Sequence, residues 1–505
     1  MRNRFTPVIF LICGLAACRP EVPQPSQNEG TVPVVISGAA EKLTPSDYNA
    51  LSSEQKYAVA DRLMATLYKG VPVSEFFDVT AGLGSPTLKG GEDFLVKTET
   101  ALFHPLEEKE VYTARIDEKY RFDSFRKPVE YPAAMLFEFP VSRDFFHRWI
   151  AYKLANTILF SPALENDSVD YTDIQDIYSR LVRMMEEGKP VREIVYEHMI
   201  SQENWRRFRS PEDNTREMIE IFLGLFDRDA DVPKAAIACK NWSLTDDQQG
   251  YQLVIGFDEN TKPQEVLGVT VVSCYDFYKA ISQHPLLISR IASVLVDHFF
   301  VGYSAEKRGE LINSIVSANP TRFEQLFSII LFSKEYLLNV ERTKGLEEAF
   351  FSIAARIKWV PYDRFFLDLS YPFAGATFST LRNMGQATFV YKLGRFPEVP
   401  LDSLGFSYYH KLIRERLLTD RKTDAFASND GGWQRELINV SLQGDEFIHY
   451  LFLSVISRKA TAEELKTLND VIVRRRFQNN KEGQAMIVFD YLSRLSEVYQ
   501  FSGIR

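Results

Sequence analysis

Four charged residues near the middle of the chain have types and a spacing that could do chemistry. Glu212, Arg216 and Glu220 follow one another at intervals of four, so on a helix they lie along one face, with Glu217 beside them. If buried, two of these carboxylates could acquire separated pKa values and transfer protons, or the row could bind a polar ligand. We favour the alternative of a charge-paired helix face, because a buried network is costly unless every charge is paired.

Other common catalytic and metal-binding patterns are missing from the sequence. There is no Gly-x-Ser-x-Gly, no Cys-x-x-Cys and no complete glycine-rich phosphate loop. Among the seven histidines, His284 and His298 come nearest to a pair, but on one helix they would stand about 21 Å apart, too far to share an ion. We therefore expect no metal and no cofactor, and a capping or packing role for each histidine.

The elements that must position these residues are predicted to be mainly helices. Ser210-Pro211 and Thr461 have the residue types that begin helices, and each is followed by an apolar period of 3.6 residues. Residues 284–300 are apolar on most faces, which indicates a central helix. The sequence predicts a mainly-α fold, a multi-helix globular body with one or two small β-hairpins.

Evidence for strands is local. Residues 251–257 and 265–272 are rich in β-formers and are separated by a turn-like tetrapeptide, so we predict a hairpin over residues 251–272. A second candidate hairpin lies near residues 110–122. Asp258 and Lys262 belong to the turn of the first hairpin and are the residues through which the charged helix face would hold it.

Two cysteines remain in the body of the chain. Cys239 and Cys274 could pair in an oxidising compartment, where a disulfide would close a loop of moderate length. Two buried free thiols are the equal alternative.

The amino terminus has the organisation of an export signal. Arg2 and Arg4 precede an apolar run over residues 5–15, which is too short to span a bilayer as a helix, and small residues then lead to Cys18. This order resembles the lipobox of bacterial lipoproteins, which implies cleavage after residue 17 and acyl chains on Cys18 that bind the lipid bilayer. Because Arg19 replaces the aspartate that retains such proteins at the inner membrane, the resemblance favours the outer membrane, on its periplasmic face or at the cell surface.

Composition limits the partners of the mature chain. Residues 18–42 are rich in proline and poor in apolar residues, as expected for an extended tether. The formal net charge is −9, and removal of Arg2 and Arg4 with the signal makes it more negative. This charge argues against nucleic acid as a partner and leaves an envelope protein or a polysaccharide.

A series of short motifs in the middle of the chain resembles the bacterial family called domain of unknown function 1800. The family's Asn-Glu-Asn-Tyr-Ala-Arg-Glu followed by Leu-Leu-Glu-Leu corresponds to residues 211–221 here, with Glu212, Arg216, Glu217 and Glu220 kept. Later matches are Asp231-Val232, Asn241-Trp242, residues 257–262 with Leu267-Gly268, His284-Pro285 and Gly385-Gln386. Phe257 stands where the family has a histidine, which argues against a metal or acid/base site in that turn.

The resemblance implies an architecture more than an activity. It places a helical core at residues 191–395, between helical regions at 43–190 and 396–505, and it adds His284 and Gln386 to the candidate functional or structural charge network. We therefore expect an envelope lipoprotein that acts as a binding or scaffold protein at a membrane surface. The alternatives are a hydrolase-like cell-surface enzyme that uses acidic residues between 212 and 262, and a structural subunit of a secreted or envelope assembly.

Overall fold

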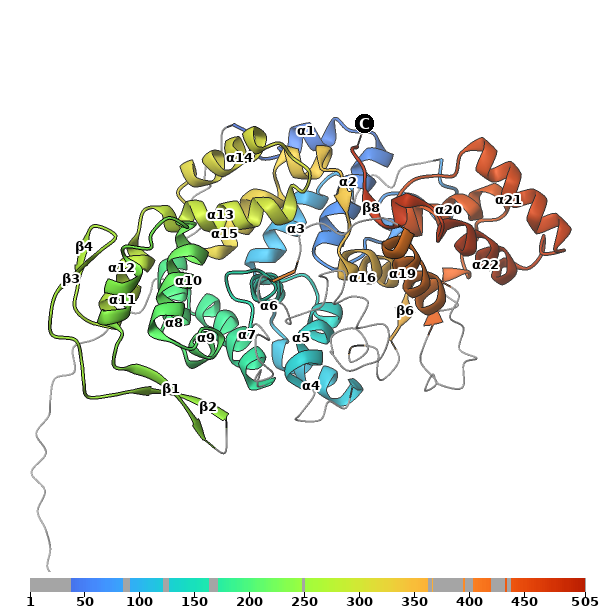
Figure 1. The fold of residues 1–505 in the computed structure, drawn as a ribbon. Helices are drawn as coiled ribbons and strands as arrows, with labels where there is room; N and C mark the ends of the chain where they lie inside the picture. Colours follow the sequence, from blue (N-terminus) through green and yellow to red (C-terminus); the bar gives the residue numbers. More distant parts are fainter. Residues whose placement is uncertain are drawn as a thin grey trace, which may run out of the picture. The chain divides into compact units, whose positions relative to one another are not determined.

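The structure is a computed structural model that describes residues 38–84, 91–120, 127–162, 171–247, 250–361, 366, 394–395, 403–418, 432–433 and 437–504. These residues all belong to one compact unit. They are mainly helical, and the sheets among them are two-stranded and antiparallel (Figure 1). The predicted mainly-α class with small hairpins is therefore confirmed.

The helices before the first strand form the first half of the body. They are α1 (Pro45–Asn49), α2 (Ser53–Thr66), the 3-10 helix η1 (Val73–Glu75), α3 (Phe94–Phe103), α4 (Lys109–Tyr120), α5 (Lys127–Glu138), α6 (Arg143–Ala155), α7 (Tyr171–Glu186), α8 (Val191–Met199), α9 (Gln202–Arg207), α10 (Pro211–Leu223) and α11 (Val232–Ala238).

The remaining helices follow the two hairpins. They are α12 (Cys274–Gln283), α13 (Leu286–Phe299), α14 (Ala305–Ser317), α15 (Phe323–Leu331), the π-helical turn η2 (Glu335–Asn339), α16 (Leu346–Arg356), α19 (Ser403–Ile413), the π-helical turn η3 (Arg414–Leu418), α20 (Gly444–Ile456), α21 (Ala462–Arg474), α22 (Lys481–Leu492) and the 3-10 helix η5 (Ser496–Val498).

Helix starts follow the predicted capping chemistry. The Ser210 hydroxyl accepts the backbone N–H of Asp213, and Pro211 is the first residue of α10. At α21, Thr461 and Glu464 satisfy each other's backbone N–H groups in a reciprocal capping box. Both predicted starts are confirmed.

The hairpin predicted over residues 251–272 is wrong in its pairing. Strand β2 (Gly250–Ile255) pairs with the preceding β1 (Trp242–Asp247), and β3 (Gln264–Val266) pairs with β4 (Val269–Val271). Each strand takes its nearest neighbour in sequence, because a short connection costs less chain entropy than a long one. Two further ladders join distant segments, β5 (Arg342–Thr343) with β8 (Gln500–Phe501), and β6 (Trp359–Val360) with β7 (Gly432–Trp433).

Two other boundaries differ from the predictions. Residues 110–122, the second candidate hairpin, lie mostly in α4, where Ile116 and Tyr120 turn one helical face inward. Residues 38–42, assigned to the tether, pack against the body. Ala40 is 1% exposed, its N–H donates to the Ser314 hydroxyl, and Lys42 forms a β-bridge with Ser333.

A disulfide joins Cys239, which caps α11, to Cys274, the first residue of α12. The sequence left open a disulfide or two free thiols, and the structure contains the disulfide. Replacing both cysteines by serine is expected to lower the free energy of unfolding by about 2–4 kcal/mol, since the closed loop of 35 residues no longer restrains the unfolded chain. Urea denaturation of the variant measures the loss, and reduced wild-type protein should match it. Equal stability of the oxidised and reduced proteins would contradict the expectation.

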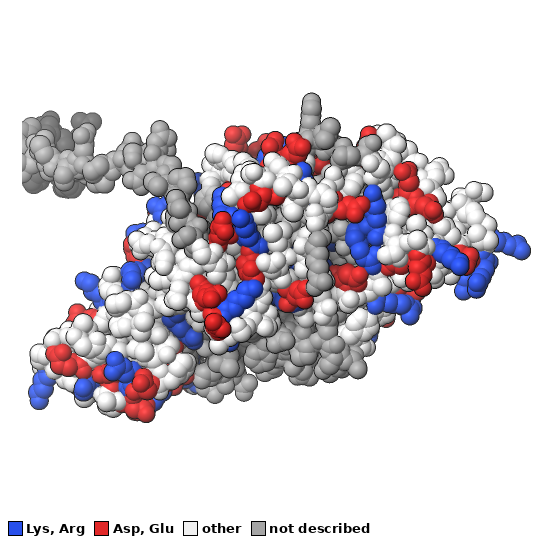
Figure 2. Space-filling model, turned by 90° about the horizontal axis from the view of Figure 1, so that it is seen from above, with Lys and Arg blue, Asp and Glu red and all other residues white. Residues whose placement is uncertain are grey.

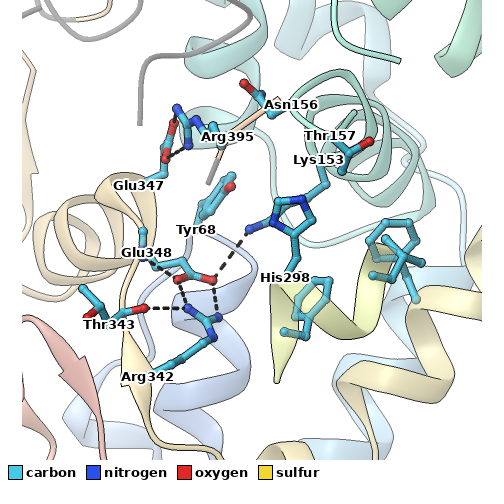
Figure 3. Close-up of a pocket in the computed structure, with 14 residues that line it drawn as sticks. Tyr68, Lys153, Asn156, Thr157, His298, Arg342, Thr343, Glu347, Glu348 and Arg395 are labelled. Carbon is cyan, nitrogen blue, oxygen red and sulfur yellow. Dashed lines mark hydrogen bonds and ion pairs between the residues drawn. The ribbon is translucent and has the colours of Figure 1, made fainter. Parts of the chain in front are cut away.

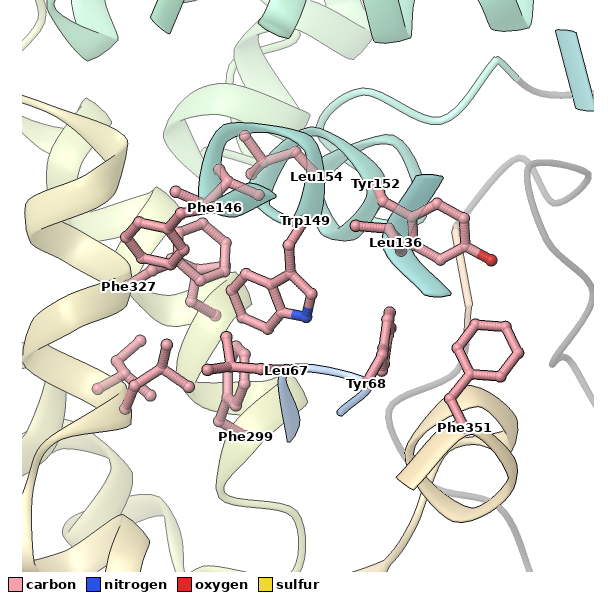
Figure 4. Close-up of a cluster of buried hydrophobic side chains, with 14 of the residues drawn as sticks. Leu67, Tyr68, Leu136, Phe146, Trp149, Tyr152, Leu154, Phe299, Phe327 and Phe351 are labelled. Atoms are coloured by element: carbon pink, nitrogen blue, oxygen red, sulfur yellow. The ribbon is translucent and has the colours of Figure 1, made fainter. Parts of the chain in front are cut away.

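Helix α6 is more completely buried than α13, the helix predicted to be central. Every residue of α6 after Arg143 is buried except Lys153, whereas α13 keeps a partly exposed face. The Trp149 ring packs edge-on against Phe327 at 5.3 Å between centroids, and its indole N–H donates to the Thr66 carbonyl at the end of α2 (Figure 4). Many of the aromatic side chains therefore pack in the interior.

The surface carries charges of both signs. On the face drawn in Figure 2, acidic and basic side chains are interspersed among uncharged residues. No helix within the described ranges combines the length and the apolar character needed to cross a membrane.

Candidate functional site

The charged stripe predicted from the sequence lies on the surface of α10. Glu212 is exposed, and Glu217 and Glu220 are half-buried. The Arg216 guanidinium lies 2.5 Å from the carboxylate of Asp229, whose side chain is 79% exposed. The stripe is a solvated, charge-paired helix face, the interpretation that we favoured.

The turn residues do not join this stripe. Asp258 pairs with Lys240 and its side chain is 91% exposed. The backbone of Lys262 bonds to the side chain of Asn260: its N–H donates to the amide oxygen, and its carbonyl accepts from the amide nitrogen. No ion pair recorded among the described residues links either turn residue to α10, so the idea that they hold the hairpin to the helix is wrong.

His284 has the capping role that the sequence suggested. Its Nδ1 accepts the backbone N–H of Leu286 where α13 begins, and its carbonyl accepts from Arg192. Gln386 lies outside the described residues. None of the described residues of the predicted network lines the cavity described next.

A different set of polar residues surrounds a partly enclosed cavity, which we call the Lys153 pocket (Figure 3). Its volume is about 70 Å³, measured by the positions that the centre of a water-sized sphere can take. The pocket lies between the carboxyl ends of α2 and α6, the end of α13, β5 and the start of α16. Its charged lining residues are Lys153, Arg342, Glu347, Glu348 and Arg395.

Two buried ion pairs form one side of the pocket. The Arg342 guanidinium donates to both carboxylate oxygens of Glu348, at 2.7 and 2.8 Å. Arg395 donates likewise to both oxygens of Glu347, at 2.6 Å each, and Tyr152 donates a third bond to Glu347. Both carboxylates are almost fully buried. In each bidentate pair the charge of one arginine balances that of one glutamate.

The Lys153 ammonium makes no hydrogen bond to either of these carboxylates. Its nearest acidic oxygen is Oε1 of Glu348, at 3.6 Å, which is beyond hydrogen-bond distance. It lies over the rings of Tyr68 and Trp149, at 4.8 and 5.5 Å from the centroids, and near Phe299. The aromatic rings stabilise the cation but accept none of its N–H groups in a directed bond.

Two uncharged groups face the same space. The side chains of Tyr68 and His298 converge with Lys153 between the two ion pairs (Figure 3). Tyr68 is 2% exposed, yet no hydrogen bond to its hydroxyl is recorded within the described residues. Likewise, no hydrogen bond within the described residues involves a ring nitrogen of His298, which lines the cavity.

The backbone at the end of α2 brings Tyr68 into the pocket. Tyr68 has a φ of +59°, a conformation that L-residues rarely adopt, and it turns the chain out of the helix. Gly70 then passes so close to α16 that a Cβ there would lie 2.5 Å from the Ser352 carbonyl oxygen. A glycine is required for this contact, which sets α2 against the helix that carries Glu347 and Glu348.

A second close approach positions Arg395. Gly394 has a φ of +75° and forms a β-bridge with Thr157, where a Cβ would lie 2.5 Å from the Thr157 carbonyl carbon. The N–H of Arg395 donates to the carbonyl of Asn156 at 2.7 Å. This backbone pairing after α6 directs the guanidinium toward Glu347.

The environment keeps these groups in defined ionisation states. Burial by itself raises the pKa of Glu348, but Arg342 and Lys153 outweigh it and hold the pKa at about 2. Burial, assisted by the positive charge of Lys153, lowers the pKa of His298 to about 3, so the imidazole is neutral at physiological pH. Burial also lowers the pKa of Lys153 from its usual 10.5, against the opposing effect of Glu348.

Comparison with known proteins does not identify a relative. No family model, no curated protein and no solved structure matches this chain. Kinship with domain of unknown function 1800 stays a prediction, and the site is interpreted from its own geometry.

The chemistry of the Lys153 pocket follows from its charge. The described lining residues hold three cations and two carboxylates, and both carboxylates are paired with arginines. One positive charge is therefore uncompensated inside a largely buried space, where an anion would be stabilised. Within the described ranges no three His, Cys, Asp or Glu side chains are grouped so that they could hold a metal ion.

From the sequence, His298 was considered only as a lone histidine, and the other residues that line the pocket were not selected. The lining residues come from six separate segments, and each looks like an ordinary helix or turn residue. The nearest signal was Lys153 itself, a charged residue on the apolar helix 143–155, whose meaning depends on partners nearly two hundred residues away.

Proposed function

We propose that this chain is an envelope lipoprotein whose helical body binds a small organic anion in the Lys153 pocket. The observation that carries the proposal is the uncompensated ammonium of Lys153, 3.6 Å from Glu348 and without a hydrogen-bond acceptor in the described part of the chain. A buried charge without a full partner is unfavourable, and an anionic ligand would complete the network.

The binding test uses thermal unfolding and calorimetric titration of the purified chain with acetate, propionate, lactate and sulfate. We expect at least one monocarboxylate to raise the unfolding temperature and to bind with a stoichiometry of one, because only a ligand that binds the folded state stabilises it. Failure of all four anions to bind would overturn the proposal.

Anion affinity is expected to fall as the pH rises. The anion needs the protonated form of Lys153, whose pKa burial lowers below 10.5, so affinity should be constant near pH 6 and decline toward pH 10. The other titratable groups that face the ligand keep their state in this range: the pKa of Glu348 is about 2, that of His298 is about 3, and burial raises that of Tyr68. Calorimetric titration at several pH values measures the decline, and an affinity that rises with pH would count against Lys153.

The tether is a separate part of the proposal and rests on the sequence. We expect Cys18→Ser to move the protein from the membrane fraction to the soluble fraction and to remove the mass of the acyl chains from its amino terminus. Cys13→Ser is the matched control, since Cys13 precedes the cleavage position and should leave membrane attachment unchanged. Soluble wild-type protein with an unmodified terminus would end this part of the proposal.

The enzyme alternative named Glu212, Glu217 and Asp258. Glu212 and Asp258 are exposed, and none of the three lines the Lys153 pocket. A structural subunit of an envelope assembly remains the second candidate, favoured only by the acidic, tethered character of the chain.

A further inference from the structure

Three side chains that line the Lys153 pocket make no hydrogen bond to the described residues through their end groups. They are Lys153, whose ammonium lies 3.6 Å from the carboxylate of Glu348, and His298 and Tyr68. The two arginines differ, because each guanidinium already gives its paired N–H groups to a glutamate. A ligand therefore meets one point charge, one imidazole and one phenol.

The single ammonium selects the charge of the ligand. Sulfate and phosphate are bound best by the planar fork of an arginine, and both forks here are occupied. A dianion would also exceed the one uncompensated positive charge and leave a buried negative charge without a partner. A monocarboxylate balances the one positive charge and brings no excess negative charge.

The imidazole selects a hydroxyl group. Burial, assisted by the positive charges of Lys153, Arg342 and Arg395, lowers the pKa of His298 against the opposing effect of Glu348 and keeps the imidazole neutral. A neutral imidazole has one nitrogen that must accept a hydrogen bond, which a plain carboxylate cannot donate. The Tyr68 hydroxyl can donate to the same ligand oxygen, so a ligand hydroxyl satisfies both groups.

The cavity limits the size of the ligand. Its 70 Å³ compares with the roughly 10–15 Å³ that one water needs on the same measure, which leaves room for about five to seven non-hydrogen atoms. Phe299, Phe327 and Leu295 add an apolar wall that suits a methyl or methylene group.

We propose that the Lys153 pocket recognises a short-chain hydroxycarboxylate of the size of lactate, with its carboxylate at Lys153 and its hydroxyl between His298 and Tyr68. This assignment rests on the proposed anion-binding function and specifies its ligand class. The hydroxyl contact distinguishes such an acid from the corresponding simple acid.

The test is calorimetric titration of the purified full chain with four probes: L-lactate, D-lactate, propionate and lactamide. Propionate lacks only the hydroxyl, and lactamide lacks only the charge. We expect one lactate enantiomer to bind at least about tenfold more tightly than propionate, the effect of one well-formed hydrogen bond, and lactamide to show no measurable binding.

Two variants assign the hydroxyl contact. Tyr68→Phe removes only the hydroxyl, and His298→Phe replaces the imidazole by an apolar ring, so each should lower lactate affinity toward that of propionate. The measured quantity is the ratio of lactate affinity to propionate affinity, which falls toward one if the hydroxyl contact is lost, and a wild-type circular dichroism spectrum shows that each variant is folded.

The outcomes separate the two proposals. Equal affinity for lactate and propionate overturns the hydroxycarboxylate assignment and leaves anion binding intact. Lactamide binding as tight as that of lactate overturns the carboxylate contact. If neither lactate nor propionate binds, the hydroxycarboxylate assignment is wrong, and anion binding itself fails when acetate and sulfate do not bind either.

Discussion

Glu348→Gln is expected to lower the free energy of unfolding by about 3–5 kcal/mol, because it leaves the buried Arg342 guanidinium without its counter-charge. Both side chains are almost fully buried, at 5% and 2% exposure, so water cannot replace the lost partner. Urea denaturation followed by circular dichroism measures the change in the free energy of unfolding. The slope of that free energy against urea concentration should equal the wild-type slope if the native and unfolded states keep their compactness.

Two controls make this result specific to the ion pair. Glu212→Gln changes an exposed glutamate on α10 and should alter stability by less than about 0.5 kcal/mol. The double variant Arg342→Met with Glu348→Leu removes both charges and should be more stable than Glu348→Gln alone. A single variant that unfolds at the wild-type urea concentration would show that the pair is not the structural support described above.

Lys153→Met is expected to reduce carboxylate affinity by at least about 30-fold, because it removes the one cation among the described lining residues that is not in a bidentate ion pair. Methionine retains the unbranched stem and suits the rings of Tyr68, Trp149 and Phe299. The Arg342–Glu348 pair remains intact, so we expect stability to be unchanged or slightly higher.

The matched control is Lys240→Met, which removes an exposed lysine that pairs with Asp258 outside the pocket. It lowers the net charge of the protein equally and should leave carboxylate affinity unchanged. Equal losses in the two variants would show that overall charge, and not the Lys153 pocket, governs binding.

Local features of the fold could be predicted because they depend on neighbours in sequence. The serine and proline before α10 and the threonine before α21 begin those helices as expected, since a cap acts within one turn. The strand predicted over residues 251–257 corresponds to β2, residues 250–255, but its partner was not predicted. Residues 242–247 include two aspartates and lack the β-rich composition used to identify strands, so their pairing with 250–255 was missed.

The interior arrangement could not be predicted because it depends on contacts between distant segments. The helix over residues 143–155 contains Asp144, His147, Arg148 and Lys153, a composition that suggests an exposed face. Asp144, His147 and Arg148 are buried because each finds a polar partner, as His147 does in Glu324, at 2.9 Å. Polar composition therefore concealed one of the deeply buried helices among the described residues.

The predicted site failed for the opposite reason. Glu212, Arg216 and Glu220 form a regular stripe that is conspicuous in the sequence, and such regularity is typical of a solvated helix face. The residues of the Lys153 pocket have no common spacing. They become a set only when α6, α13, β5 and α16 pack together.

The most direct test of the central claim is the anomalous diffraction of a crystal soaked in sodium bromide, a monoanion that makes no demand on ligand shape. An anomalous peak at about 3.0–3.5 Å from Nζ of Lys153, absent in Lys153→Met, is the result that an uncompensated buried cation predicts. Bromide bound only at surface lysines and arginines, with this pocket lacking a peak, would contradict it.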